Sequence, residues 1–169
     1  MKRSFIILAM LMVLALCPTV IAIGFLNHIP STDAIEKNYR ELADKEVSPN
    51  MGFLDVSASM STDDLTIFVT IDNATTIEVH QAVIFGAMAY INYYLQHNEP
   101  GKAIIYVYKA GETQIGTGTI YSKWVDDWRE NPNHSGHIGY SDTADRTLLM
   151  KVWNATNVWT WELPKVPEP

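Results

Sequence analysis

Cysteine is almost absent from this chain of 169 residues. Its one cysteine, Cys17, lies inside an uncharged apolar run near the N-terminus, where a single cysteine usually acts as a small hydrophobic residue. The rest of the chain therefore cannot form an internal disulfide, a thiol nucleophile or a zinc site with cysteine ligands. Because about 140 residues can bury a stable core without such links, we expect one domain held together by packing.

Basic side chains are also scarce. Lysine and arginine number 12 against 19 aspartate and glutamate residues, which gives a formal net charge of −7, and two of the basic residues are Lys2 and Arg3. Binding to nucleic acid depends on clustered lysine and arginine. The charge pattern therefore excludes a nucleic-acid partner.

Motifs that would identify an enzyme are missing. The sequence contains no G-x-S-x-G elbow, no P-loop and no H-E-x-x-H pair. Gly116 and Gly118 form a G-x-G, but the third glycine that opens a helix in nucleotide-binding folds does not follow. Asp126 and Asp127 would point about 100° apart on a helix, which is typical of a solvated face. No cofactor is predicted.

The N-terminus carries the longest apolar run. Residues Phe5 to Leu26 have no charge and, as a helix, would extend about 33 Å, enough to cross a bilayer. The run is either an uncleaved anchor or a signal peptide cut after Val20-Ile21-Ala22, and lipidation at Cys17 is disfavoured by the large Leu16 before it. In each case the positive end stays in the cytoplasm and the domain lies outside, anchored by a single pass or secreted.

Four segments follow from these patterns. Residues 1–26 are the anchor or signal peptide, and 27–50 form a polar juxtamembrane stalk helix with a narrow apolar stripe of Ile35, Tyr39 and Leu42. Residues 51–163 form the extracytoplasmic domain, and 164–169 are a loose tail. The charge pairs at i, i+4 spacing in the stalk mainly support the helix itself.

The segment from Thr76 to His97 is predicted to be a central buried helix. Its apolar residues recur at steps of three and four over a wide face. Thr75 and Glu78 have the spacing of a capping box, and Asn98 begins the break that ends the helix. Gly86 is expected to allow close approach to a sheet.

The fold class that these elements predict is α+β. Strand patterns at 53–59, 65–71, 103–109 and 114–121 flank the central helix and predict an antiparallel sheet of about four strands in ββαββα order, with the helix packed on one face. A short helix is expected over 123–130. Residues 141–154 favour a helix, although an edge strand fits the same pattern.

Two histidines are the best candidates for binding a metal. His134 and His137 lie in a polar loop with Glu130, Asp142 and Asp145 near in sequence, and imidazole with carboxylate suits zinc. The pair lacks the i, i+4 spacing that would place both rings on one helix face, and polar loop histidines are more commonly unliganded.

All five tryptophans fall in the last third of the chain. Trp124, Trp128, Trp159 and Trp161 are the candidate binding residues, because tryptophan combines a large apolar ring with a polar tip. Such rings suit a stacking platform for a glycan, an interfacial patch near lipid or a contact with a protein partner. The alternative interpretation is that the tryptophans complete the core by covering the sheet over Gly116 and Gly118.

Three glycosylation sequons begin at Asn73, Asn133 and Asn154, a mild excess over chance. Together these features predict a non-catalytic envelope module that binds a protein or a glycan. The two other hypotheses are a metal-dependent hydrolase using His134 and His137, and a structural subunit that assembles through a sheet edge or the stripe of Ile35, Tyr39 and Leu42.

Overall fold

The computed structural model describes residues 32–45, 52–72, 75–111, 113–134, 138 and 143–159, which belong to one compact unit, Thr32–Pro169. The elements are α2 (Thr32–Lys45), β1 (Phe53–Met60), β2 (Asp64–Ile71), α3 (Thr76–His97), β3 (Lys102–Lys109), β4 (Thr113–Tyr121), α4 (Ser122–Arg129), α5 (Thr143–Asn154) and β5 (Asn157–Val158). The predicted anchor or signal peptide, residues 1–26, lies outside the described residues. Within the described residues, no helix is long and apolar enough to cross a bilayer.

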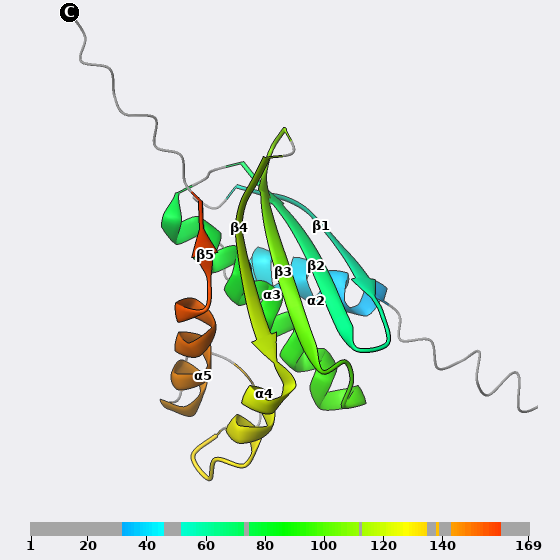
Figure 1. Cartoon of the computed structure of the whole chain (residues 1–169), viewed down its shortest axis with the longest axis vertical. Helices are drawn as coiled ribbons and strands as arrows, with labels where there is room; N and C mark the ends of the chain where they lie inside the picture. The colour runs from blue at the N-terminus through cyan, green and yellow to red at the C-terminus, as the bar shows by residue number, and fades with distance from the viewer. Residues whose placement is uncertain are drawn as a thin grey trace, which may run out of the picture. The chain divides into compact units, whose positions relative to one another are not determined.

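The α+β class is confirmed, but the sheet is mixed, with five strands in the order β1-β2-β3-β4-β5 (Figure 1). β2 and β3 are parallel, with Asp64 opposite Lys102 and Ile71 opposite Lys109, while the other pairs are antiparallel. The prediction of a purely antiparallel sheet was wrong. The reason is the length of α3: its 22 residues extend about 33 Å, so the helix carries the chain back along the whole strand before β3 begins.

One face of the sheet packs against α3. Alternate residues of β2 and β3 are buried, and a Cβ built on Gly86 of α3 would lie 2.7 Å from Cγ1 of Ile105. Gly86 therefore allows the close approach that the sequence predicts. Gly116 and Gly118 of β4 are covered by Val79 and Val83 of α3, so the interpretation in which tryptophans cover these glycines was wrong.

The ends of α3 are fixed by the expected residues. The Thr75 N–H donates to Oε2 of Glu78 at 2.9 Å and the Glu78 N–H donates to Oγ1 of Thr75 at 3.4 Å, which completes the capping box. At the other end Asn98 has a left-handed backbone with φ of 57°, and its N–H donates to the Tyr94 carbonyl at 2.7 Å. Both ends can be recognised from local sequence because both depend on neighbouring residues alone.

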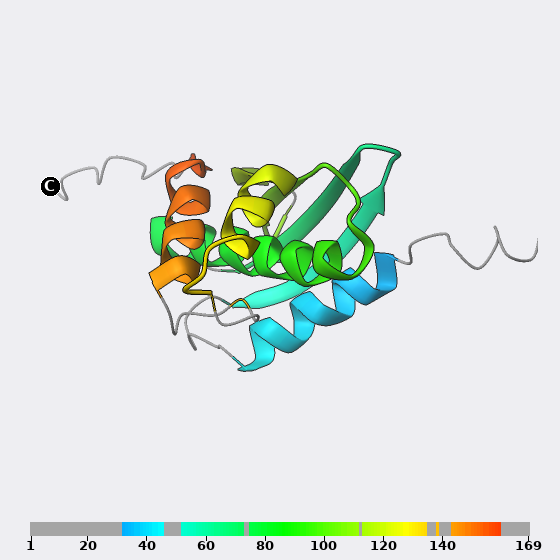
Figure 2. The ribbon, with the colours of Figure 1, turned by 90° about the horizontal axis from the view of Figure 1, so that it is seen from below.

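Helix α2 belongs to the core, although its sequence predicts a polar juxtamembrane stalk helix. Ile35 and Tyr39 are fully buried, and the Tyr39 hydroxyl donates to the Ala82 carbonyl of α3 at 3.2 Å. Figure 2 shows α2 and α3 side by side. The stalk prediction was wrong because a narrow apolar stripe is enough to bury a helix that packs between a second helix and a sheet edge.

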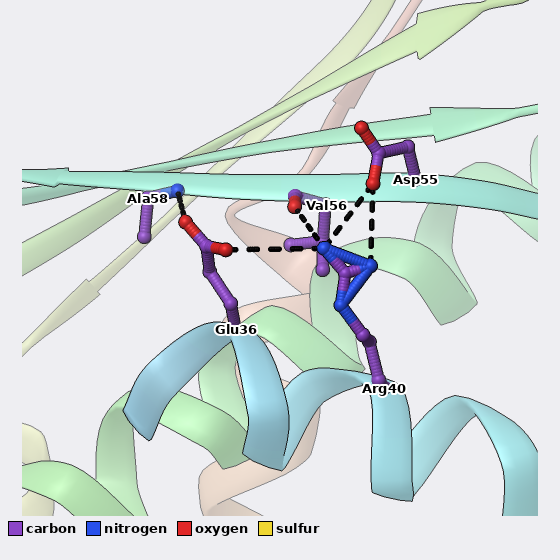
Figure 3. Close-up of polar contacts among 5 residues, drawn as sticks. All are labelled: Glu36, Arg40, Asp55, Val56 and Ala58. Atoms are coloured by element: carbon purple, nitrogen blue, oxygen red, sulfur yellow. Dashed lines mark hydrogen bonds and ion pairs between the residues drawn. The ribbon is translucent and has the colours of Figure 1, made fainter. Parts of the chain in front are cut away.

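The side chains of Glu36 and Arg40 cover the free edge of β1 (Figure 3). Oε1 of Glu36 accepts from the Ala58 N–H at 2.8 Å, and Nη2 of Arg40 donates to the Val56 carbonyl at 2.8 Å. Arg40 also pairs with Asp55 at 3.2 Å. These contacts satisfy backbone groups that an edge strand otherwise offers to another chain.

Candidate functional site

A small pocket lies between α4 and α5. Its volume is about 80 Å³, and its lining combines two tryptophans with polar side chains: Trp124, Asp127, Trp128, Asn131, Ala144, Thr147, Leu148 and Lys151. We call it the α4–α5 pocket. Two of the four predicted binding residues, Trp124 and Trp128, therefore lie together on its wall.

A buried hydrogen bond holds the two helices together beneath the pocket. Nε1 of Trp128 donates to Oδ1 of Asp145 at 2.9 Å, with Trp128 only 4% exposed and Asp145 fully buried. The bond gives the buried indole N–H an acceptor and the buried carboxylate a donor, so both polar groups have a hydrogen-bond partner away from water. Trp128 is thus a fixed wall of the pocket. The interpretation that tryptophans complete the core holds for this residue.

The rim of the pocket is accessible and polar. Trp124 is half-buried, and its ring meets the ring of Tyr121 edge-on at 5.1 Å. Asp127, Thr147 and Lys151 are exposed, so an acceptor, a hydroxyl and a cation lie beside the aromatic wall. This combination can orient a ligand that has one apolar portion and one polar tip.

Asp126 fixes α4 to the end of α3. Its carboxylate accepts from the Tyr94 hydroxyl at 3.1 Å and pairs with Nη2 of Arg129 at 2.9 Å. Burial raises the pKa of Tyr94, and the hydrogen bond to Asp126 raises it further. Asp126 is therefore a structural partner, although its side chain is still 38% exposed. Asp127 is exposed, as the sequence predicts for both.

The other tryptophans lie elsewhere. The Trp159 backbone N–H donates to the Ile115 carbonyl at 2.8 Å just after β5, its side chain is 44% exposed, and it does not line the pocket. Trp161 lies outside the described residues. Trp153 stacks on His80 of α3, with 4.0 Å between ring centroids. Of the four predicted binding residues, Trp124 and Trp128 thus line the α4–α5 pocket, Trp159 lies elsewhere, and Trp161 is not described.

The structure describes only one of the two histidines predicted to bind a metal. The ring of His134 lies 4.9 Å from that of Trp128, while His137 is outside the described residues. Within the described residues, no group of three or more histidine, cysteine, aspartate or glutamate side chains is placed to hold a metal. A metal at His134 and His137 stays a prediction.

Two of the three sequon asparagines, Asn133 and Asn154, are exposed, the first in the turn after α4 and the second at the last residue of α5. Asn73 lies outside the described residues. Glycosylation at these positions remains a prediction.

The polar part of the pocket was not predicted from the sequence. Thr147 and Lys151 stand four residues apart on one face of α5, a spacing that the sequence contains, and Asn131 follows α4. Their partnership with Trp124 and Trp128 could not be predicted, because no local pattern states that α4 and α5 lie against each other.

No family model, curated protein or solved structure matches this chain. The proposals that follow therefore depend on its own residues.

Proposed function

We propose that this protein is a non-catalytic binding module of the cell envelope that holds a protein partner through the α4–α5 pocket. The observation that carries the proposal is the pairing of Trp124 and Trp128 with a polar rim in one pocket. The apolar run of Phe5 to Leu26 supports a position outside the cytoplasm, with the domain either anchored in the membrane or exported.

The size of the pocket favours a side chain as its occupant. Pockets that enclose whole small molecules are typically about 300–1,000 Å³, and this one is about 80 Å³. It has room for the end of one side chain, which is how protein partners commonly place an anchor residue.

The lining indicates which anchor would fit. Trp124 and Leu148 offer apolar walls, and Asp127 and Lys151 offer charge at the rim. An aromatic or long aliphatic side chain with a polar end would bury its stem between the walls and keep its tip in contact with the rim.

The hypothesis of a structural assembly subunit has less support from the geometry. Assembly through a sheet edge needs free backbone groups, and those of Val56 and Ala58 on the β1 edge are bound by Arg40 and Glu36. Ile35 and Tyr39 of the apolar stripe are fully buried. The metal-dependent hydrolase remains a separate hypothesis, which native mass spectrometry of protein purified without chelator would test.

Photo-crosslinking in the cells that produce the protein tests the proposed site. A photoreactive amino acid replaces Thr147, which lines the pocket, or Met150, which is 53% exposed on the same helix and does not line it. We expect a specific protein adduct from position 147 that is absent from position 150 and weaker in a Trp124→Ala background. Identical adducts from both positions, or none from position 147, would contradict the proposed site.

A further inference from the structure

The face of the sheet opposite α3 carries a patch of aromatic and hydroxyl side chains. Figure 1 looks onto this face, with α2 and α3 behind the sheet. Within the described residues no helix lies over it, and the outward residues of β2 and β3 are partly exposed where their neighbours are buried. We call it the open face and define it by Ser57, Thr66, Phe68, Tyr106, Tyr108 and Thr117.

Strand register brings the aromatic rings together at the centre of the open face. Phe68 lies opposite Tyr106, and their rings are nearly parallel, 17° apart in plane with 5.7 Å between centroids. Tyr108 adds a third ring at 6.3 Å from Phe68. Three partly exposed rings on adjacent strands form one continuous aromatic surface.

Hydroxyl groups flank these rings in the same cross-strand row. Ser57 is opposite Phe68 on the β1 side, and Thr117 is opposite Tyr106 on the β4 side. The Thr117 hydroxyl donates to the Ile105 carbonyl at 3.0 Å, which leaves its oxygen able to accept. The row therefore places hydrogen-bonding groups on both sides of an apolar centre.

Charge is neutralised on the open face. Asp55 at one end pairs with Arg40 at 3.2 Å, and Asp64 at the other end pairs with Lys102 at 3.2 Å. The residues that define the open face carry no charge, although the chain as a whole has a formal net charge of −7. An uncharged ligand is the complementary partner for such a surface, since an anionic or cationic one would find no counter-charge at its centre.

The area of the open face argues against a second copy of the chain as its occupant. Four strands about 4.8 Å apart and eight or nine residues long outline about 500 Å². A stable interface needs about 800 Å² on each partner. A narrow linear ligand, in contrast, needs to cover only the aromatic row.

We propose that the open face binds an uncharged carbohydrate chain. The C–H faces of sugar rings pack on Phe68, Tyr106 and Tyr108, and the sugar hydroxyls exchange hydrogen bonds with Ser57, Thr117 and the tyrosine hydroxyls. This surface is distinct from the α4–α5 pocket, and the inference does not depend on the proposed protein partner.

Titration calorimetry of the purified full chain with cellohexaose, mannohexaose and hexa-N-acetylchitohexaose tests the inference. At least one of these neutral hexasaccharides should bind at millimolar concentration or below, and an anionic alginate hexasaccharide should bind more weakly. Tyr106→Leu keeps an apolar side chain but removes the ring, and should weaken binding at least tenfold. Tyr106→Phe should retain most of the affinity.

Two controls distinguish this surface from others. Trp159→Ala removes another exposed aromatic side chain, and Asp127→Ala alters the α4–α5 pocket; both should leave carbohydrate binding unchanged. The inference is overturned if none of the three neutral hexasaccharides binds at millimolar concentration, or if Tyr106→Leu binds as well as the wild type. A stable dimer in sedimentation that Tyr106→Leu dissociates would overturn it in favour of a second copy.

Discussion

At the scale of single residues, the two glycines of β4 decide how closely α3 approaches the sheet. Gly116 faces Val79 and Gly118 faces Val83, and a Cβ at either position would overlap the valine side chain. Valine is branched at Cβ and sits in the buried face of the helix, so it has little freedom to move away. The missing side chains are a packing requirement.

Gly118→Ala should therefore destabilise the protein by about 1–3 kcal/mol, the usual cost of overpacking a core. Urea unfolding would measure this change. Gly101→Ala is the matched control, because its Cβ would meet only the Asp63 carbonyl at an ordinary 3.6 Å. An equal effect of both substitutions would show that α3 does not pack against β4 as described.

Two buried tyrosines link stability to pH. Burial raises the pKa of Tyr39 far above its ordinary value, and burial together with the charges of Tyr94 and Asp126 raises that of Tyr90. Each hydroxyl has a backbone partner, the Ala82 carbonyl for Tyr39 and the Pro100 carbonyl for Tyr90 at 2.7 Å. Both side chains are thus held neutral in the folded protein.

A raised pKa of this kind gives stability that is fully present below the unfolded value of about 10 and is lost as pH rises toward the folded pKa. We expect the free energy of unfolding to fall above pH 10 by about 1.4 kcal/mol per pH unit for each tyrosine. Tyr39→Phe should cost about 0.5–1.5 kcal/mol at neutral pH, through the lost hydrogen bond, and reduce the alkaline slope. An unchanged slope in urea titrations would contradict the burial of this hydroxyl.

At the scale of elements, α2 protects the sheet edge with the charges that made it resemble a solvated stalk. Glu36 and Arg40 pair with each other at 3.8 Å and also bind the β1 backbone. Lys37 and Glu41 form a solvent-exposed i, i+4 pair at 3.9 Å. The same spacing in sequence thus serves two purposes. Only the position of β1 beside the helix tells them apart.

Arg40→Ala should destabilise the domain by about 0.5–1.5 kcal/mol, because the Val56 carbonyl loses its donor. The exposed edge should also increase self-association, measured by light scattering at increasing concentration. Lys37→Ala on the same helix is the control and should change stability by less than about 0.5 kcal/mol. If both variants behave alike, the contacts of Arg40 with β1 do not protect the edge.

Elements that depend on local signals could be predicted, and those that depend on distant partners could not. The spacing of apolar residues and the Thr75–Glu78 and Asn98 signals define α3 from neighbours in the chain. The parallel pairing of β2 with β3 depends on how far α3 carries the chain. The burial of α2 depends on Ala82 and Val56, which lie far away in sequence.

At the scale of the whole molecule, the two surfaces of interest lie on different elements. The α4–α5 pocket is formed by the two helices that follow the sheet, and the open face by β1 to β4. The sequence indicates the aromatic residues of the α4–α5 pocket, since Trp124 and Trp128 stand four residues apart. The sequence does not indicate the open face, because Phe68 and Tyr106 lie side by side only through the parallel register of β2 and β3.

Binding of a partner through the α4–α5 pocket is tested by the affinity of the full chain for the protein that crosslinks at position 147, measured by calorimetry. We expect Trp124→Ala to weaken binding at least tenfold, equivalent to about 1.4 kcal/mol. Trp159→Ala, which removes an exposed ring outside the pocket, should change the affinity less than about twofold, well under 1 kcal/mol. An equal loss from both substitutions, or no loss from Trp124→Ala with the fold intact, would contradict the claim that the α4–α5 pocket holds the partner.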